Sequence, residues 1–215
     1  GNNFLRAIGN SLIISVTTTI VAVIVGVGAG YALARLNFPG KGAVTGVILA
    51  ASMFPGIALV TPLFQLFGDL NWIGTYQAMI IPNISFALPL TIYTLVSFFR
   101  QLPWELEEAA RVDGASRGQA FRLVLLPLAA PALFTTAILA FIATWNEFML
   151  ARQLSTTATE PVTVAIARFS GPSAFEYPYA SIMAAGALVT IPLIIMVLIF
   201  QRRIVSGLTA GGVKA

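Results

Sequence analysis

The sequence predicts an all-α protein that crosses a membrane several times. Of its 215 residues, 58% are hydrophobic and only 9% are charged, and the mean hydropathy is +0.89. A soluble domain has about 25% charged residues, so this chain carries too few charges to cover a surface that faces water. It contains instead several apolar stretches of about 20 residues, the length of a helix that spans a bilayer core of roughly 30 Å. The short segments of alternating polarity that mark a membrane β-barrel do not occur in the sequence.

Five spans form a helical bundle in a single predicted transmembrane domain, residues 1–215. The apolar stretches place these spans at about 12–33, 44–67, 77–99, 121–150 and 181–200. Polar loops at 100–119 and 151–179 separate the third, fourth and fifth spans. Proline removes a backbone donor and bends a helix, and every span except the first contains it. We therefore expect kinks in four of the spans.

The distribution of basic residues predicts the orientation of the chain. Cytoplasmic loops of membrane proteins carry an excess of Lys and Arg. If the loop at 100–119 is cytoplasmic, nine of the twelve basic residues lie on that side. Only Arg6, Arg152 and Arg168 then lie outside. The first residue of the chain is thus predicted outside and the C-terminus in the cytoplasm.

The sequence offers few residues for catalysis or for nucleotide binding. It has no Cys and no His, and no GxxxxGK[ST] loop that could cradle phosphates. Charges inside a membrane mark ion and proton pathways, and Glu147 is the only acidic residue in the predicted spans. One class to consider is an enzyme or a scaffold within the membrane. The predicted spans contain no HExxH pair and no carboxylate dyad that would support it. A proton- or sodium-coupled carrier would need more ionisable residues in its spans, so if the chain is a carrier its energy is expected to come from elsewhere.

The polar loop between the third and fourth spans is predicted to form a short surface helix, a tight turn and a second helix. Acidic residues gather near its start, where the positive end of a helix dipole favours them. Gly114 suits the left-handed residue that ends many helices. Ser116 and Gln119 have the spacing of a capping box, which would begin the second helix. Glu107 and Arg111 are four residues apart, and we expect an ion pair between them.

One face of the first loop helix carries small and apolar side chains at positions i, i+3, i+4 and i+7. These residues are Leu106, Ala109, Ala110 and Asp113. Small side chains would let the backbone of another protein approach closely. An amphipathic helix that rests on the membrane surface has a similar pattern. The pattern alone leaves both interpretations open.

A spaced motif runs from this loop into the fourth span: Glu108-Ala109-Ala110, then Gly114, Val124 and Leu126-Pro127. It resembles the EAA signature of ABC-importer permeases, and Val124 in place of the usual Ile is its one departure. The resemblance extends over essentially the whole chain and includes segments 10–12, 34–41, 145–148 and 207–214. The last of these is similar to the end of the second permease of maltose-type carbohydrate importers, and most similar to trehalose importers of mycobacterial type.

The resemblance implies a type I ABC-importer permease fold and a transport subunit without enzymatic activity, in the bacterial cell membrane. The expected cargo is a sugar, a disaccharide such as trehalose, with a non-sugar solute as the alternative. The expected partners are a companion permease, a cytosolic ATPase dimer and an extracellular substrate-binding lipoprotein, with no nucleic acid. ATP and Mg²⁺ would bind to the ATPase, and this chain would bind no cofactor or metal. Such permeases have six spans, so the first is expected to be missing here.

The resemblance also assigns a role to the cytoplasmic loop. In this family the loop helix docks in a groove of the ATPase and transmits its motion to the spans. The residues expected to make this coupling contact are Leu106, Glu108, Ala109, Ala110, Asp113 and Gly114.

Polar and aromatic residues in the outer halves of the spans are candidates for the substrate pathway, because sugar sites combine hydrogen-bonding groups with aromatic faces. The candidates are Phe54, Gln65, Asn83, Trp145, Asn146 and Glu147, with Phe86 and Phe148 as further aromatic residues. The structural alternative is that the amides join helices and that Glu147 meets water at the interface.

The outer loop at 151–179 has two interpretations. By resemblance, residues 156–177 would reach into the extracellular binding protein. A solvated spacer accounts for the length of the loop equally well.

Overall fold

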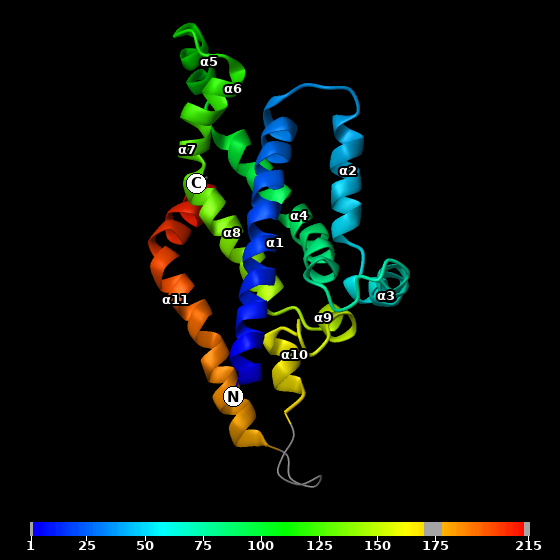
Figure 1. Ribbon diagram of the computed structural model, residues 1–215. Coiled ribbons are helices and arrows are strands. Elements are labelled where there is room, and N and C mark those ends of the chain that lie inside the picture. The colour runs from blue at the N-terminus through cyan, green and yellow to red at the C-terminus, as the bar shows by residue number, and fades with distance from the viewer. Residues whose placement is uncertain (1, 170–177, 213–215) are drawn as a thin grey trace.

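Helices make up the whole fold in the computed structural model, which describes residues 2–169 and 178–212, with side chains over 3–169 and 178–199. No strand occurs among these residues, so the predicted all-α class is confirmed (Figure 1). The helices are α1 (Asn2–Arg35), α2 (Lys41–Ser52), η1 (Gly56–Leu59), α3 (Val60–Asp69), α4 (Tyr76–Gln101), α5 (Glu105–Val112), α6 (Arg117–Ala120), η2 (Phe121–Leu125), α7 (Leu126–Leu128), α8 (Ala130–Trp145), α9 (Met149–Leu154), α10 (Val162–Ala167) and α11 (Tyr179–Gly212).

Three helices are long and apolar enough to cross a membrane without a break: α1, α4 and α11. Two further spans are possible if each bent helix pair counts as one. One pair joins α2 to η1–α3 at an angle of 87°, and the other joins α6–α7 to α8 at 70°. The three continuous helices overlap the first, third and fifth predicted spans, and the two bent pairs overlap the second and fourth.

The prolines account for where the two breaks fall. Pro55 precedes η1 with an extended backbone, φ −70° and ψ 112°, and Pro62 follows within α3. Pro127 and Pro131 flank the junction between α7 and α8. In contrast, α4 continues through Pro82 and Pro89 as one helix. The prediction of 121–150 for the fourth span differs from the structure at its end, because α8 stops at Trp145.

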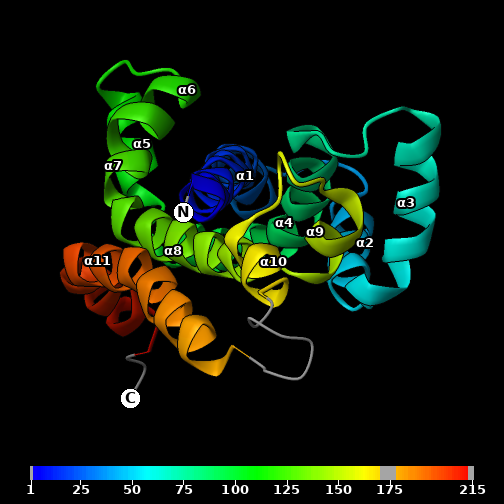
Figure 2. The same cartoon turned by 60° about the horizontal axis from the view of Figure 1, so that its bottom comes forward.

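The packed centre of the molecule is formed by α1, α4 and α8. Glycine allows α1 and α4 to approach closely: a Cβ built on Gly26 would lie 2.4 Å from a methyl group of Thr91, and one on Gly30 would lie 2.9 Å from Cβ of Leu95. In Figures 1 and 2, α2 and α3 lie on one side of this centre and α11 on the other. Close contact between small residues is the usual way in which membrane helices associate.

The polar segments gather at opposite ends of the helices. Figure 1 shows α5 and α6 at the same end as the connection between α1 and α2. The start of α1, α9 and α10 lie toward the other end. The predicted loops at 100–119 and 151–179 therefore lie at opposite ends of the fold, except that 170–177 falls outside the described residues.

Candidate coupling loop and transport pathway

The loop between α4 and α8 has the predicted local structure. Helix α5 ends in a Schellman motif, in which the amide of Ala115 donates to the carbonyl of Ala110 at 3.0 Å and that of Gly114 to Arg111 at 3.1 Å. Gly114 adopts the left-handed conformation that this motif requires, with φ +90°. Ser116 and Gln119 form both bonds of a capping box at the start of α6, at 3.3 Å and 2.7 Å.

Two buried side chains bind this loop to the end of α1. Glu107 is 6% exposed, and the hydroxyl of Tyr31 donates to its Oε1 at 3.1 Å. Arg35 donates from Nη2 to the carbonyl of Leu102, and its guanidinium lies 4.3 Å from the ring centroid of Trp104. The loop is therefore attached to a membrane-spanning helix through side chains as well as through its own chain.

The prediction of an ion pair between Glu107 and Arg111 is wrong. Among the described residues the one ion pair within 4.0 Å joins Arg168 to Glu160. The two side chains do not pair because α5 packs with Glu107 facing α1, where the hydroxyl of Tyr31 donates to its carboxylate. Arg111 remains exposed.

The exposed face of α5 is shifted from the predicted one. Leu106 and Ala110 are half-buried, because α5 packs against η2. The other four predicted coupling residues, Glu108, Ala109, Asp113 and Gly114, are exposed. Val112 was not among the predictions, yet 87% of it is exposed. Its spacing of four residues from Glu108 would have placed it on the same face.

Two of the six predicted pathway residues, together with the further aromatic candidate Phe86, line a pocket between α4 and α8. The pocket has a volume of about 180 Å³, and its lining includes Asn83, Phe86 and Glu147. Hydroxyl groups of Thr91, Thr136 and Thr144 bond to carbonyls four residues earlier in their own helices, and these residues also line it. The lining thus combines amide, carboxylate and aromatic groups.

The other predicted pathway residues lie apart from this pocket. Trp145 is 1% exposed and stacks on Phe141 with ring centroids 5.5 Å apart. Asn146 is exposed, and its Nδ2 donates to the carbonyl of Ile142 at 2.8 Å. Phe54 and Gln65 are exposed on the segment that contains α2 and α3. The candidate set is therefore split, and only Asn83 and Glu147 of the six line the same pocket.

Glu147 also caps the start of α9, a structural role that was not predicted from the sequence. Its two carboxylate oxygens accept from the amides of Leu150 at 2.8 Å and Ala151 at 3.0 Å, at the start of α9. A carboxylate at this position satisfies free amides and stabilises the positive end of the helix. The backbone of Glu147 is held by Thr163, whose hydroxyl donates to its carbonyl at 2.9 Å.

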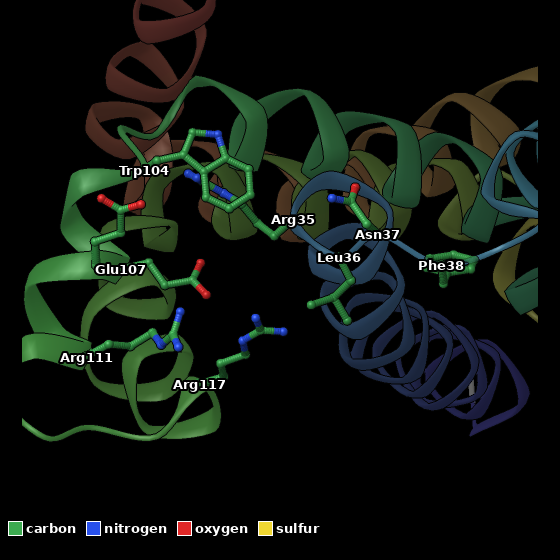
Figure 3. Close-up of a pocket in the computed structure, with 9 residues that line it drawn as sticks. Arg35, Leu36, Asn37, Phe38, Trp104, Glu107, Arg111 and Arg117 are labelled. Carbon is green, nitrogen blue, oxygen red and sulfur yellow. The ribbon is translucent and has the colours of Figure 1, made fainter.

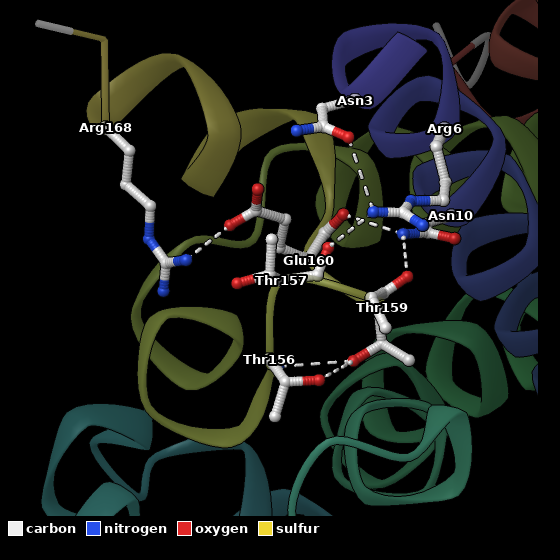
Figure 4. Close-up of polar contacts among 9 residues, drawn as sticks. Asn3, Arg6, Asn10, Thr156, Thr157, Thr159, Glu160 and Arg168 are labelled. Atoms are coloured by element: carbon white, nitrogen blue, oxygen red, sulfur yellow. Dashed lines mark hydrogen bonds and ion pairs between the residues drawn. The ribbon is translucent and has the colours of Figure 1, made fainter.

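The first part of the loop at 151–179 is bound to α1, as Figure 4 shows. Buried Asn10 donates from Nδ2 to the carbonyls of Ala158 at 3.1 Å and Glu160 at 2.9 Å. Its Oδ1 accepts from the hydroxyl of Tyr76 at 2.7 Å. Glu160 in turn pairs with Arg168 at 2.7 Å. Residues 159 and 160 are buried, whereas 156–158 are exposed, so the segment is bound to α1 along one side and open on the other. Residues 170–177 of the same loop lie outside the described part.

The fold and the capped loop define a polytopic membrane permease. The family described as "Binding-protein-dependent transport system inner membrane component" matches residues 22–210, and the chain belongs to this family of transport subunits. It is 54% identical over its whole length to the trehalose transport system permease protein SugB of Mycobacterium tuberculosis, covering 78% of that protein. It is 47% identical over 95% of its length to the trehalose/maltose transport system permease protein MalG of Thermococcus litoralis, covering 74% of that protein.

Solved structures of transporters share the fold. A bacterial ABC transporter involved in the import of the acidic polysaccharide alginate aligns with a TM-score of 0.77 at 24% identity, over 94% of this chain and 75% of that one. The inward-facing MetNI methionine ABC transporter aligns with a TM-score of 0.76 at 18% identity, over 95% of both chains. The helical permease architecture predicted from the sequence is confirmed.

Proposed function

We propose that this chain is a permease subunit of an ATP-driven importer for a carbohydrate, with a trehalose-type disaccharide as its cargo. The 54% identity to a trehalose permease over the full chain carries this proposal. The 41% identity to the sulfoquinovosyl glycerol permease of Agrobacterium fabrum also favours a glycoside. The orientation follows from the basic residues, with the start of the chain outside and the C-terminus in the cytoplasm.

In this proposal α5 docks on a cytosolic ATPase dimer, which binds ATP and Mg²⁺. The contact is made by the exposed residues Glu108, Ala109, Val112, Asp113 and Gly114, with Leu106 and Ala110 supporting the helix from behind. Closure of the ATPase dimer would displace α5, and the bonds of Tyr31 and Arg35 would carry that displacement into α1. Rigid-body movement of this kind is a common switching mechanism.

The cargo would pass along α4 and α8 in this proposal. Asn83 and Glu147 supply hydrogen-bonding groups and Phe86 an aromatic face, the combination that favours sugars. At about 180 Å³, the pocket is below the roughly 300 Å³ at which small-molecule sites begin. A disaccharide would therefore need a companion permease to complete its site. The outer loop, residues 156–177, would face an extracellular binding lipoprotein.

Uptake of radiolabelled trehalose by cells with and without this gene tests the proposed cargo. Deletion should abolish uptake, and a plasmid copy should restore it. Unlabelled maltose and a non-sugar solute, such as an amino acid, serve as competitors. Undiminished trehalose uptake in the deletion strain would refute the trehalose assignment. Loss of amino acid uptake instead would favour the alternative cargo.

A further inference from the structure

A pocket of about 480 Å³ lies beside the end of α1, next to α5 (Figure 3). Its charged lining residues are Arg35, Glu107, Glu108, Arg111 and Arg117. In Figure 3 the side chains of Glu107, Arg111 and Arg117 point toward a common space. The lining therefore carries three positive charges against two negative ones, and it favours an anion that can also meet a carboxylate.

Arg35 has hydrogen-bond donors that the protein leaves unused. Its side chain is 5% exposed, and Nη2 is bonded to the carbonyl of Leu102. Nε and Nη1 have no hydrogen-bond partner among the described residues. A buried guanidinium with unpaired donors is unfavourable. Both atoms are covered in this structure, so a phosphate oxygen would reach them only when the Arg35 side chain turns into the pocket, where the bonds would be charge-assisted.

The carboxylate of Glu107 lacks a hydrogen-bond donor, as the guanidinium of Arg35 lacks acceptors. Its Oε1 accepts from Tyr31, whereas its buried Oε2 has no donor in the described part of the chain. A ligand that carries both an anionic oxygen and a hydroxyl group would serve Arg35 and Glu107 together. A phosphate ester of a polyol has both groups.

The position of the pocket indicates where such a ligand comes from. The apolar stretch of α1 ends at Leu33, two residues before Arg35, so the pocket lies near the membrane–water boundary when this stretch spans the bilayer. Trp104 and Phe38 also line it and are exposed, as aromatic residues at a membrane interface are. Basic pockets at this level bind the head groups of anionic lipids.

We propose that the pocket binds the head group of an anionic phospholipid with free hydroxyls, such as phosphatidylglycerol. The phosphate interacts with the exposed side chains of Arg111 and Arg117. Arg35 and Glu107 turn their covered atoms into the pocket on binding, so that Arg35 also meets the phosphate and Oε2 of Glu107 accepts from a head-group hydroxyl. Ala109 and Val112, on the exposed face of α5, do not line the pocket. Glu108 is the one proposed ATPase contact that also lines the pocket, so the lipid and a docked ATPase would meet only at this residue. The site extends beyond the transport function proposed above.

Native mass spectrometry of the assembled importer in a neutral detergent tests the site. Phosphatidylglycerol, phosphatidylcholine and soluble glycerol phosphate are titrated separately. The double variant Arg111→Gln, Arg117→Gln is the main probe, because both residues are exposed and their loss leaves the buried bonds of Arg35 intact. Arg122→Gln is the matched control, since Arg122 is exposed near the same end and does not line the pocket.

Wild-type importer should bind phosphatidylglycerol about tenfold more tightly than phosphatidylcholine, and the double variant should lose about tenfold in affinity. Arg122→Gln should bind as the wild type does. Equal losses in the double variant and the control would overturn the proposal in favour of general surface charge. Glycerol phosphate that competes as well as the lipid would assign the pocket to a soluble phosphate ester. Unchanged lipid binding, with the pocket cross-linked to a carboxylate of the ATPase, would assign it to that protein.

Discussion

At the scale of single residues, Gly114 is the position in the loop between α4 and α8 that depends most on one residue type. Its φ of +90° costs an ordinary L-residue about 1–2 kcal/mol. A Cβ at this position would meet no atom within 4 Å. The constraint is therefore conformational, and it holds the end of α5 in the Schellman motif that orients α6.

Gly114→Val should abolish substrate uptake while leaving the protein in the membrane. The β-branched residue cannot adopt the left-handed conformation easily, so the bonds from Gly114 and Ala115 into α5 would be lost. Uptake is measured in cells, and insertion is checked by immunoblotting of membranes. Gly118→Val is the control, because Gly118 is helical and also has open space around its Cα. Normal uptake by Gly114→Val would show that the turn is not needed for coupling.

Glu147 has two candidate roles that one substitution can separate. As a helix cap it bonds two amides of α9, and Glu147→Gln keeps one acceptor and loses the charge. Loss of a cap costs about 1 kcal/mol, so we expect a lower melting temperature of the purified complex. A pathway role would in addition raise the KM for uptake. Arg152→Gln, an exposed change on α9, is the control. Unchanged stability and KM would remove Glu147 from both roles.

At the scale of secondary-structure elements, contact between α1 and α4 depends on which face of α1 carries glycine. Gly26 and Gly30 lie against Thr91 and Leu95. Gly28 lies on another side of the same helix, and a Cβ there would meet nothing within 4 Å. The three glycines thus offer a matched comparison within a single helix.

Gly26→Val should destabilise the protein, and Gly28→Val should be tolerated. At Gly26 the added atoms overlap the Thr91 methyl group, and overpacking typically costs about 1–3 kcal/mol. The readout is the melting temperature of the purified complex in detergent, together with its yield from membranes. Equal behaviour of the two variants would mean that α1 and α4 are not closely packed in the assembled protein.

The elements also show which features could be predicted from the sequence. The capped loop was predictable, because Gly114, Ser116 and Gln119 act within a few residues of each other. The partner of Glu107 was not, because Tyr31 lies 76 residues away and only packing brings it close. The burial of Trp145 likewise depends on α1 and α10, which contribute Ala7, Val162 and Ala165 to its cluster. Proline predicted kinks in both segments, but it did not distinguish α4, which continues through Pro82 and Pro89, from α2 and η1–α3, which meet at 87°.

At the scale of the whole molecule, α1 is bonded to the polar segments at both ends of the fold. At the loop end, Tyr31 and Arg35 bind Glu107 and Leu102. At the opposite end, Asn10 binds the carbonyls of Ala158 and Glu160. Between these contacts α1 is a continuous helix. A displacement of α5 can therefore reach the outer loop through one element.

Tyr31→Phe tests this connection, because it removes one hydroxyl and leaves the ring contacts with Phe99 and Phe121 in place. Glu107 then loses its donor, and an unpaired buried acceptor costs about 1–3 kcal/mol, which should loosen α5 from α1. In proteoliposomes with the assembled importer, we expect several-fold less substrate moved per ATP hydrolysed, with ATP hydrolysis itself retained. Tyr93→Phe, at an exposed position on α4, should keep the wild-type ratio. An unchanged ratio in Tyr31→Phe would mean that force reaches the spans through the backbone into α8, and not through the side-chain bonds to α1.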